Sequence, residues 1–348
     1  MNKLIDLRTD TITQPTADML DAMQRATQGD DSRDGDATVI KLEALAATLN
    51  GKEAGLYMPS GTMTNLVAVL AHTTRAGEVL LERGAHMLNT ELGGLAAVAG
   101  VFYKGVPGER GAMEQSALRE AIRPMTRNNF GTALICMETT HNGAGGAVLP
   151  LDHMRMVHAL AREHGIPVHT DGARLFNAAV ALGVPAAEIA GHTDSVCFCV
   201  SKGLSAPVGS VLCGPSSFIE RARTFRRMVG GNMRQAGSIA AAGIVSLETM
   251  VKRLAEDHAT AQRLATGLHD VATSLVDPRD VETNIVRVNI RASGRTSAQW
   301  ADDFKLHGIA VSPADSGSLR FVTHRHISNA DVDATIAACR VLWSQCEA

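Results

Sequence analysis

The sequence predicts an α/β protein with a mostly parallel central sheet and a smaller C-terminal α+β domain. Short apolar runs alternate with helical patterns over residues 50–215, an order typical of a parallel sheet. From residue 285 onward, a strand that alternates apolar and polar residues is followed by helical and strand-like segments. At 348 residues the chain can form two cores, so we predict domains over residues 1–245 and 246–348.

The individual elements follow from hydrophobic spacing and from the residues that cap helices. Thr16 is predicted to cap a helix after an extended N-terminal arm, and Gly51 is predicted to end the next helix. The predicted helices span residues 17–28, 39–49, 62–72, 154–164, 236–275, 297–306 and 331–343. The predicted strands span residues 55–59, 78–81, 132–137, 166–169, 195–200, 285–290 and 319–323.

Composition narrows the class of protein. Apolar residues make up 45% and charged residues 20% of the chain, as in ordinary globular proteins. The net charge of −3 argues against a nucleic-acid-binding surface. Six cysteines, most of them inside apolar runs and none in a CxxC pair, predict buried thiols in a reducing compartment. With neither a signal-peptide core nor a membrane-spanning run, we expect a cytoplasmic protein without a membrane partner.

Two strand ends carry residues that can do chemistry. The apolar run at residues 168–170 leads into Asp171, and the run at 195–200 leads into Lys202, 31 residues further on. In α/β sheets, ligands bind just outside the carboxyl ends of the strands. A lysine there can form a Schiff base with pyridoxal phosphate (PLP), and a carboxylate can pair with its protonated pyridine nitrogen. Each residue alone also has an ordinary interpretation, a solvated strand end for Lys202 and a turn cap for Asp171.

Further residues fit the same cofactor. Ser60-Gly61-Thr62 stands between a strand and a helix, where backbone N–H groups and hydroxyls form either a phosphate site or an ordinary cap. Arg174 follows Asp171 and is either a ligand for an anion or a surface arginine. His86 can stack on the pyridine ring and move protons, or be purely structural. Arg320 lies on a strand of the small domain and can clamp a substrate carboxylate across the domain crevice, or be solvated at a strand edge.

Taken in order, these residues resemble the L-threonine aldolase family of PLP-dependent enzymes, and the similarity covers most of the chain. Agreement at many ordered blocks is more specific than any single motif. The similar segments are DLRTDT at residues 6–11, GKEA at 51–54, PSGTM at 59–63, THN at 140–142, DGARLFN at 171–177, SKGL at 201–204, GNMRQ at 231–235 and VTH at 322–324.

The resemblance implies a fold-type I PLP enzyme that reversibly cleaves a β-hydroxy-α-amino acid, such as L-threonine or L-allo-threonine, to glycine and an aldehyde. It implies a homotetramer, a dimer of dimers with active sites shared between subunits. The implied catalytic residues are Lys202, His86, Asp171 and Arg174. The implied cofactor ligands are these four with Ser60, Gly61 and Thr62, together with Arg227 and Arg234, which reach the phosphate of a neighbouring subunit. The implied ligands of the substrate carboxylate are Thr9, Arg174 and Arg320. No metal site is predicted.

The sequence departs from the family pattern around the substrate side chain. In the acidic loop at residues 29–37, Arg33 stands where an aromatic residue is expected. Thr90 replaces a tyrosine after His86, and a histidine expected before the strand at 132–137 corresponds to Asn128 or Asn129. Asn232 replaces a glycine. The cofactor ligands are retained, so the resemblance specifies the reaction class more firmly than the aldehyde or the preference between threo and allo substrates.

Other functions remain open at this stage. A racemase, a β-eliminating enzyme or a transaminase would use the same cofactor on a different bond at Cα. An aldolase with an unusual side-chain substrate is a second alternative, since Arg33 could bind an anionic group. A PLP-binding protein without catalytic activity is a third, although Lys202, Asp171 and Arg320 argue against it. A nicotinamide-binding fold is disfavoured, because no GxGxxG motif follows a first strand.

Overall fold

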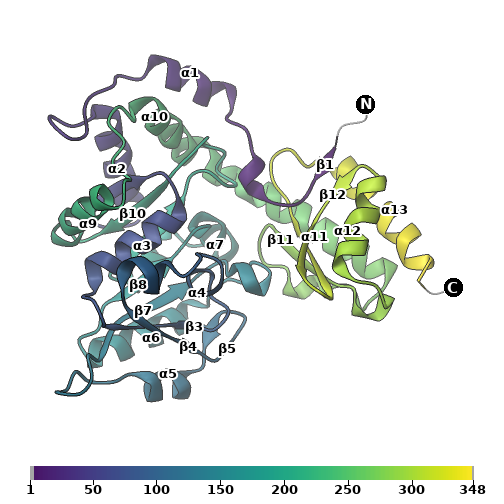
Figure 1. Cartoon of the computed structure of the whole chain (residues 1–348). Helices are drawn as coiled ribbons and strands as arrows, with labels where there is room; N and C mark the ends of the chain where they lie inside the picture. The colour runs from purple at the N-terminus through teal and green to yellow at the C-terminus, as the bar shows by residue number, and fades with distance from the viewer. Residues whose placement is uncertain (1–3, 347–348) are drawn as a thin grey trace.

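The computed structural model describes residues 4–346 and contains a larger unit and a smaller C-terminal unit (Figure 1). The larger unit is built on a seven-stranded sheet in the order β2-β10-β9-β8-β7-β3-β4. Only β10 runs antiparallel to its neighbours, which confirms the mostly parallel sheet. The strands are β2 (Ala54–Met58), β3 (Glu78–Glu82), β4 (Phe102–Val106), β7 (Thr132–Glu138), β8 (Val168–Asp171), β9 (Ser195–Cys199) and β10 (Ser210–Gly214).

Helices pack on this sheet through apolar faces. In α6 the buried residues Met154, Val157, Leu160 and Ala161 recur at helical spacing and join the main core. Residues 108–113 add a short hairpin of β5 (Gly108–Glu109) and β6 (Ala112–Met113). The helices of this unit are α1 (Ala17–Arg25), α2 (Ala37–Leu49), α3 (Gly61–His72), α4 (His86–Asn89), α5 (Gln115–Ala121), α6 (Leu151–Glu163), α7 (Leu175–Leu182), α8 (Ala186–Ala190), α9 (Ser216–Met228) and α10 (Gly237–Val245).

The smaller unit has its own core around an antiparallel sheet of order β11-β14-β13. Trp300, Phe304 and Phe321 are fully buried there. The N-terminal arm contributes Ile5 and Leu7 to this core before it crosses to α1 on the larger unit (Figure 1). The elements are β1 (Ile5–Asp6), α11 (Leu254–Val271), β11 (Ile285–Asn289), α12 (Ser297–Leu306), β12 (Ile309–Ala310), β13 (Ser312–Asp315), β14 (Ser318–Val322) and α13 (Asn329–Ser344).

The arm joins the smaller unit through a parallel pairing of β1 with β12. The second core supports the predicted division of the chain at residue 245, which itself remains a prediction. Short 3₁₀ and π turns connect the main elements and break the helical stretch predicted over residues 236–275 into α10 and α11. These turns are η1 (Asp10–Ile12), η2 (Leu95–Ala99), η3 (Asn142–Ala144), η4 (Ser246–Met250), η5 (Val251–Arg253), η6 (Pro278–Asp280) and η7 (Arg291–Ser293).

Most predicted elements are confirmed to within a few residues. The Thr16 hydroxyl accepts a hydrogen bond from the amide of Met19 and caps α1, although the helix ends at Arg25. Gly51, at φ 60°, follows the end of α2 as predicted. Elements that were not predicted from the sequence include β4, β10, α5 and α9. Strand β4 lies at the sheet edge with its first three residues exposed, so it carries no apolar run.

Two compositional expectations can be compared with the structure. All six cysteines are free thiols, and all but Cys346 are buried, which confirms the expectation of buried thiols. Among the described residues 4–346, no helix is both long enough and apolar enough to cross a lipid bilayer.

Candidate active site

A cavity of about 400 Å³ lies at the carboxyl ends of β7, β8 and β9, where the strand-end argument placed a ligand. It brings together residues from the arm, the large sheet and the small unit. Nine of the predicted site residues line it: Thr9, Ser60, Gly61, Thr62, His86, Asp171, Arg174, Lys202 and Arg320. Arg227 and Arg234 do not line it; they border a separate surface hollow of about 200 Å³ with Ser32, Gly230 and Asn232.

Lys202 is fixed by the turn that follows β9. Its carbonyl accepts a hydrogen bond from the Ser205 amide at 2.9 Å and another from the Thr13 hydroxyl at 2.7 Å. A side chain at Gly203 would come within 3.0 Å of Leu254, so the turn lies close against the helix that leads to the small unit. The backbone of Lys202 is therefore anchored on both sides, while its side chain lines the cavity.

Asp171 ends β8 and makes the turn-capping contact that is the ordinary interpretation of this residue. One carboxylate oxygen accepts the amide of Ala173 at 3.0 Å, which is the turn-capping contact. The other oxygen accepts the side-chain amide of Asn65 at 2.8 Å. The residue is 2% exposed and still lines the cavity, so the carboxylate is held in place for a partner that enters there.

The start of α3 forms the anion-binding part of the cavity. The Ser60 hydroxyl accepts the Met63 amide at 3.2 Å and so caps the helix, while its proton stays available to a ligand. Gly61 lets the helix start approach β9, because a Cβ atom there would lie 2.9 Å from the Cys199 sulfur. Amides at the first turn of this twelve-residue helix, with the Thr62 hydroxyl, suit a phosphate group.

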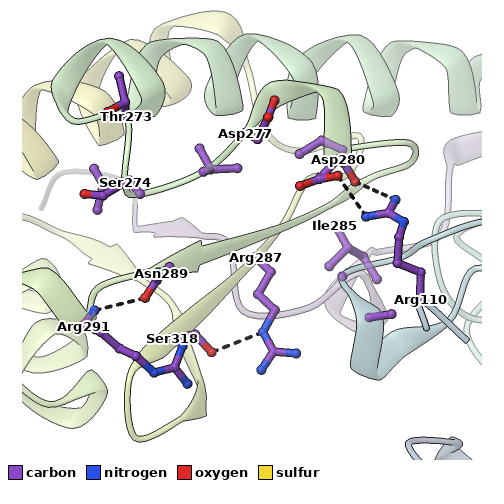
Figure 2. Close-up of a pocket in the computed structure, with 15 residues that line it drawn as sticks. Arg110, Thr273, Ser274, Asp277, Asp280, Ile285, Arg287, Asn289, Arg291 and Ser318 are labelled. Carbon is purple, nitrogen blue, oxygen red and sulfur yellow. Dashed lines mark hydrogen bonds and ion pairs between the residues drawn. The ribbon is translucent and has the colours of Figure 1, made fainter. Parts of the chain in front are cut away.

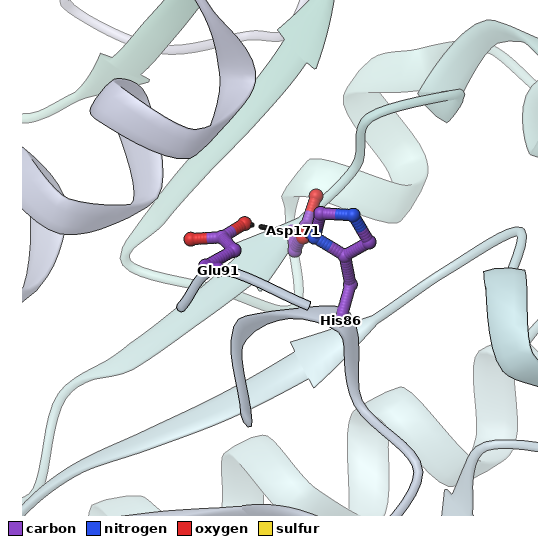
Figure 3. A group of neighbouring side chains, drawn as sticks. All are labelled: His86, Glu91 and Asp171. Carbon is purple, nitrogen blue, oxygen red and sulfur yellow. Dashed lines mark hydrogen bonds and ion pairs between the residues drawn. The ribbon is translucent and has the colours of Figure 1, made fainter. Parts of the chain in front are cut away.

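His86 begins the short helix α4 and is held at both its backbone and its ring. Its amide donates to Glu138 at 2.7 Å, and its Nδ1 lies 2.9 Å from Glu91 (Figure 3). The hydrogen bond to Glu91 raises the pKa of His86, while partial burial opposes that effect. The ring remains 30% exposed and lines the cavity, where it can accept or release a proton.

Arg174 is not a surface arginine, because its side chain is 6% exposed and forms two hydrogen bonds of 2.7 Å with Asp10. Burial alone would raise the pKa of Asp10, but the charge and hydrogen bonds of Arg174, with the charge of Lys202, hold that pKa well below its usual range. Asn284 donates a further hydrogen bond to Asp10 at 3.1 Å. The sequence analysis missed Asp10, although it lies in the first of the family-like segments.

Arg320 reaches the cavity from β14 of the small unit. One of its terminal nitrogens donates to the Asn142 side chain at 2.9 Å and the other to the Arg8 carbonyl at 3.3 Å. Its Nε is buried and has no partner among the described residues, which favours an anion in the cavity because a buried unpaired donor costs free energy. Burial and the charge of Arg174 lower the pKa of Arg320. Thr9 contributes a hydroxyl that contacts Thr11.

Glu138 links the loop that carries His86 to the loop that carries Asn142. It was also not predicted from the sequence as a site residue. One carboxylate oxygen accepts the His86 amide and the other accepts the Asn142 amide, each at 2.7 Å. Burial raises the pKa of Glu138, and the charge of His141 opposes it. Its position at the carboxyl end of β7 is equivalent to that of Asp171 on β8, so the strand-end argument could have found it.

The departures from the family pattern fall in different places. Thr90 lines the cavity with a side chain smaller than the tyrosine of the family pattern. Arg33 is 78% exposed beside Asp30 and does not line the cavity formed by this chain. Asn128 and Asn129 belong to a surface turn at residues 126–129. Asn232 joins the acidic loop to α9 through hydrogen bonds with Ser32 and Arg226.

A second cavity, of about 340 Å³, lies between the two units and shares no lining residue with the first (Figure 2). Arg110, Arg287 and Arg291 line it, but each is already paired with a carboxylate: Arg110 with Asp280 and Glu282, and the other two with Asp315. Because these charges are neutralised within the protein, this cavity does not have the free cationic groups of an anion site.

The residues of the cavity that contains Lys202 and Asp171 match the functional groups of PLP. Lys202 offers an amine for its aldehyde, Asp171 a carboxylate for its ring nitrogen, and the start of α3 a site for its phosphate. The unpartnered Nε of Arg320 leaves a cationic donor for the carboxylate of an amino acid. The chemistry of this donor set therefore fits the cofactor together with an amino-acid substrate.

Comparisons with known proteins agree with this geometry. The family model of the beta-eliminating lyases matches residues 6–291. Low-specificity L-threonine aldolase 1 of Arabidopsis thaliana is 41% identical over 338 residues, 96% of this chain and 94% of its own length. The low specificity L-threonine aldolase of Escherichia coli K12 is 38% identical over 96% of this chain and 98% of its own length.

The fold is also shared with solved structures. A threonine aldolase of Leishmania major superposes with a TM-score of 0.80 at 17% identity, over 97% of this chain and 99% of that one. The beta-eliminating lyase match covers more than three quarters of the sequence, and each of the two aldolase relatives covers 96% of it. The chain therefore belongs to the low-specificity L-threonine aldolases, a family of PLP-dependent lyases of fold type I.

Proposed function

We propose that the protein reversibly cleaves L-threonine, L-allo-threonine and related β-hydroxy-α-amino acids to glycine and an aldehyde. The observation that carries this proposal is the single cavity that contains Lys202, Asp171, the start of α3 and Arg320. It offers ligands for PLP and for an amino-acid carboxylate in one place. The relatives named as low-specificity L-threonine aldolases support this reaction over the other PLP reactions at Cα.

Each of these residues would bind a different part of the cofactor or the substrate. Lys202 would hold PLP covalently, Asp171 would pair with its ring nitrogen, and Ser60, Gly61 and Thr62 would bind its phosphate. Arg320 would bind the substrate carboxylate, helped by the Thr9 hydroxyl. Arg174 contacts Asp10 through Nε and one terminal nitrogen, so its second terminal nitrogen is the group that would contact the cofactor oxygen or the substrate carboxylate.

The reaction breaks the bond between Cα and Cβ. A base takes the proton of the β-hydroxyl, the carbon–oxygen double bond of the aldehyde forms, and the electron pair of the broken bond passes to the Cα side, which is then protonated to give glycine. When bound, PLP supplies the electron sink for that pair. His86 is the proposed base, directly or through water. Its ring lines the cavity, and Nε2, the ring nitrogen that does not contact Glu91, can accept a proton.

The proposed assembly is a homotetramer with active sites shared between subunits. Arg227 is exposed and Arg234 is half-exposed, on the same surface hollow, which supports a role for both at the active site of a neighbouring chain. The edge strand β4 exposes Phe102 and Tyr103, and apolar side chains of this size on an edge favour contact with another subunit. The proposed compartment is the cytoplasm, supported by six free thiols.

A panel of substrates tests the reaction. The holoenzyme is incubated with L-threonine, L-allo-threonine, L-serine, L-phenylserine and an acidic 3-hydroxy amino acid, and glycine, pyruvate and the enantiomer of each substrate are measured. The proposal predicts glycine from at least one of the two threonine isomers, since both have the β-hydroxyl that the cleavage requires. Pyruvate or an enantiomer without glycine would instead assign β-elimination or racemisation.

A further inference from the structure

Asn65 lies one turn into α3, below the anion-binding start of the helix, and its side chain is surrounded by hydrogen-bonding partners. The amide nitrogen lies 2.8 Å from Asp171 Oδ2 and 2.8 Å from Glu91 Oε1. Two carboxylates can only accept, so each receives one of the two amide protons. Asn65 is 2% exposed, and its hydrogen bond to Asp171 is buried.

The carbonyl side of the same amide is equally defined. Asn65 Oδ1 lies 3.2 Å from His169 Nε2 and 3.1 Å from the Cys197 sulfur. Both of these neighbours can donate, and His169 continues the chain through Ser195 to His72 with contacts of 2.9 and 2.7 Å. Burial lowers the pKa of His169 to about 4 and that of His72 to about 3, so both rings are neutral near pH 7.

With neutral rings, only one direction of donation satisfies the whole chain. His72 donates to Ser195, Ser195 donates to His169, and His169 donates to Asn65, whose amide then donates to the two carboxylates. Every donor in the series therefore points toward Asp171 and Glu91. Hydrogen bonds that are aligned in this way polarise one another and favour the negatively charged acceptors at the end.

Glu91 connects the hydrogen bond from Asn65 to the ring of His86. The oxygen of Glu91 that accepts from Asn65 also lies 2.9 Å from His86 Nδ1. Figure 3 shows the side chains of Glu91 and His86 close to that of Asp171. An ionised carboxylate accepts, so Nδ1 carries the proton of the neutral ring and Nε2 keeps its lone pair. A protonated Glu91 would donate instead and could move the ring proton to Nε2.

The ionisation of Glu91 affects the pKa of His86, because Glu91 is one of the charged groups around its ring. Glu91, Asp171 and Glu138 all face the ring, and the Glu91 side chain is 7% exposed. Burial and the charge of Asp171 raise the pKa of Glu91, whereas the hydrogen bonds from His86 and Asn65 oppose them. Without the Asn65 amide, Glu91 would lose one of the donors that keep it ionised beside Asp171.

The ligand atoms of His86, Glu91 and Asp171 lie within 4.8 Å of one another, an arrangement that could also suggest a metal site. Here, however, the amide protons of Asn65 point at both carboxylates from between them, and a cation in the same place would meet those protons. The group is therefore better described as a hydrogen-bonded unit in which Asn65 donates to Asp171 and Glu91, and Glu91 pairs with His86.

We propose that Asn65 is a positioning residue, whose amide bridges Asp171 and Glu91 and thereby keeps the proton of His86 on Nδ1 and its Nε2 open toward the cavity. The proposal deepens the function proposed above, since it assigns the form in which His86 acts as base. Asn65 acts through Glu91 on the proton and through Asp171 on the residue that pairs with the ring nitrogen of PLP. It lines the cavity beside these two groups and couples them through its hydrogen bonds.

The test measures the protonation of His86 as well as activity. Holoenzyme labelled with ¹⁵N-histidine is titrated by NMR, with the His86 signals assigned from a His86→Gln variant. The unmodified protein is expected to show the Nδ1–H form of His86 above its pKa. Asn65→Leu and Glu91→Gln are each expected to lower the His86 pKa, Glu91→Gln by removing a negative charge beside the ring and Asn65→Leu by removing a donor that opposes protonation of Glu91. The kcat of Asn65→Leu is expected to fall about tenfold or more, with a smaller change in KM.

A double variant separates positioning from a general effect on folding. If Asn65 acts on His86 through Glu91, Asn65→Leu lowers the His86 pKa no further once Glu91→Gln is present. Asn50→Leu is the matched control, because Asn50 is a fully buried amide at the end of α2, remote from the cavity, and should leave His86 unchanged. Asn65→Ser provides a smaller replacement if the leucine does not fold.

Several results would overturn the proposal. They are an Nε2–H form of His86 in the unmodified protein, a His86 pKa that Asn65→Leu and Asn65→Ser leave unchanged, and additive effects in the double variant. These signals are read from the histidine itself, so they remain interpretable if the substrate panel gives no glycine. If the unmodified holoenzyme releases no glycine but the His86 response is as expected, the proposed function is contradicted and the role of Asn65 in positioning His86 remains supported.

Discussion

At the scale of single residues, the cavity is defined by groups whose backbones or side chains are fixed by neighbours. Lys202 is anchored by Thr13 and Ser205, and Arg174 by Asp10. Arg320 differs, because it keeps one buried donor without a partner among the described residues. Preorganised groups of this kind bind a charged ligand without first giving up many conformations of their own.

The first residue-scale prediction concerns covalent attachment of PLP. Lys202→Ala removes the amine, so borohydride should no longer fix the cofactor to the protein, and glycine release should fall by about 10³-fold or more. Lys41→Ala, a change at an exposed lysine on α2, should retain both properties. Mass spectrometry of the reduced protein reads the attachment directly, and a cofactor fixed to another lysine in the unmodified protein would refute the assignment.

The second concerns the substrate carboxylate. Arg320→Lys keeps the charge but loses the planar donor group, so KM should rise by about 10- to 100-fold with a smaller change in kcat. Steady-state kinetics with the best substrate of the panel measure this. Arg263→Lys, at an exposed arginine paired with Asp333, is the matched control. An unchanged KM in Arg320→Lys would place the carboxylate elsewhere.

At the scale of elements, strand ends and helix starts could be predicted from the sequence, while contacts between distant segments could not. Asp171 and Lys202 were found because each follows an apolar run, and Ser60 because it precedes a helical pattern. Asp10 and Asn65 were missed because their roles depend on partners 164 and 106 residues away, Arg174 and Asp171 respectively. No local pattern reports such pairs, and the same holds for the bond from Arg320 to Asn142.

The two histidines joined through Ser195, His72 on α3 and His169 on β8, have a consequence for stability. His72 has a pKa of about 3 in the folded protein, mainly through burial, whereas an unfolded histidine titrates near 6.5. Between these values the unfolded chain binds a proton that the folded protein does not, so the free energy of unfolding falls as pH decreases below 6.5. His72→Gln should reduce that slope by about 1.4 kcal/mol per pH unit.

Denaturant unfolding between pH 4 and pH 7 measures this slope. His164→Gln is the control, since His164 lies exposed at the end of α6 and lacks the burial that acts on His72. The difference between the two variants isolates the buried position from the mere loss of a histidine. Equal slopes for His72→Gln and the unmodified protein would mean that the ring is protonated in the folded state.

At the scale of the whole molecule, the small unit completes the site that the large sheet begins. The arm carries Thr9 and Asp10 between the two units, and β14 supplies Arg320. The cavity therefore depends on how the units are held together, and β1, paired with β12, fastens the arm to the small unit. The fold class and both units were predictable from strand order, but this shared use of the arm was not.

Subunit mixing tests whether active sites are shared. Lys202→Ala and Arg227→Ala should each be nearly inactive alone, since one lacks the amine and the other the arginine given to a neighbouring site. Unfolded together and refolded as a mixture, they should recover up to about a quarter of the unmodified activity, because some hybrid sites carry neither change. If the refolded mixture recovers no activity, or if Arg227→Ala alone is fully active, a shared site at Arg227 is excluded.

The most direct test of the account is the product balance of the unmodified holoenzyme with its better threonine isomer. Glycine and acetaldehyde are measured in the same reaction over time. Cleavage between Cα and Cβ predicts equal amounts of the two products and the reverse synthesis of the β-hydroxy amino acid when both are supplied. Substrate consumed without equimolar glycine and acetaldehyde would contradict the assignment of this cavity to aldol cleavage.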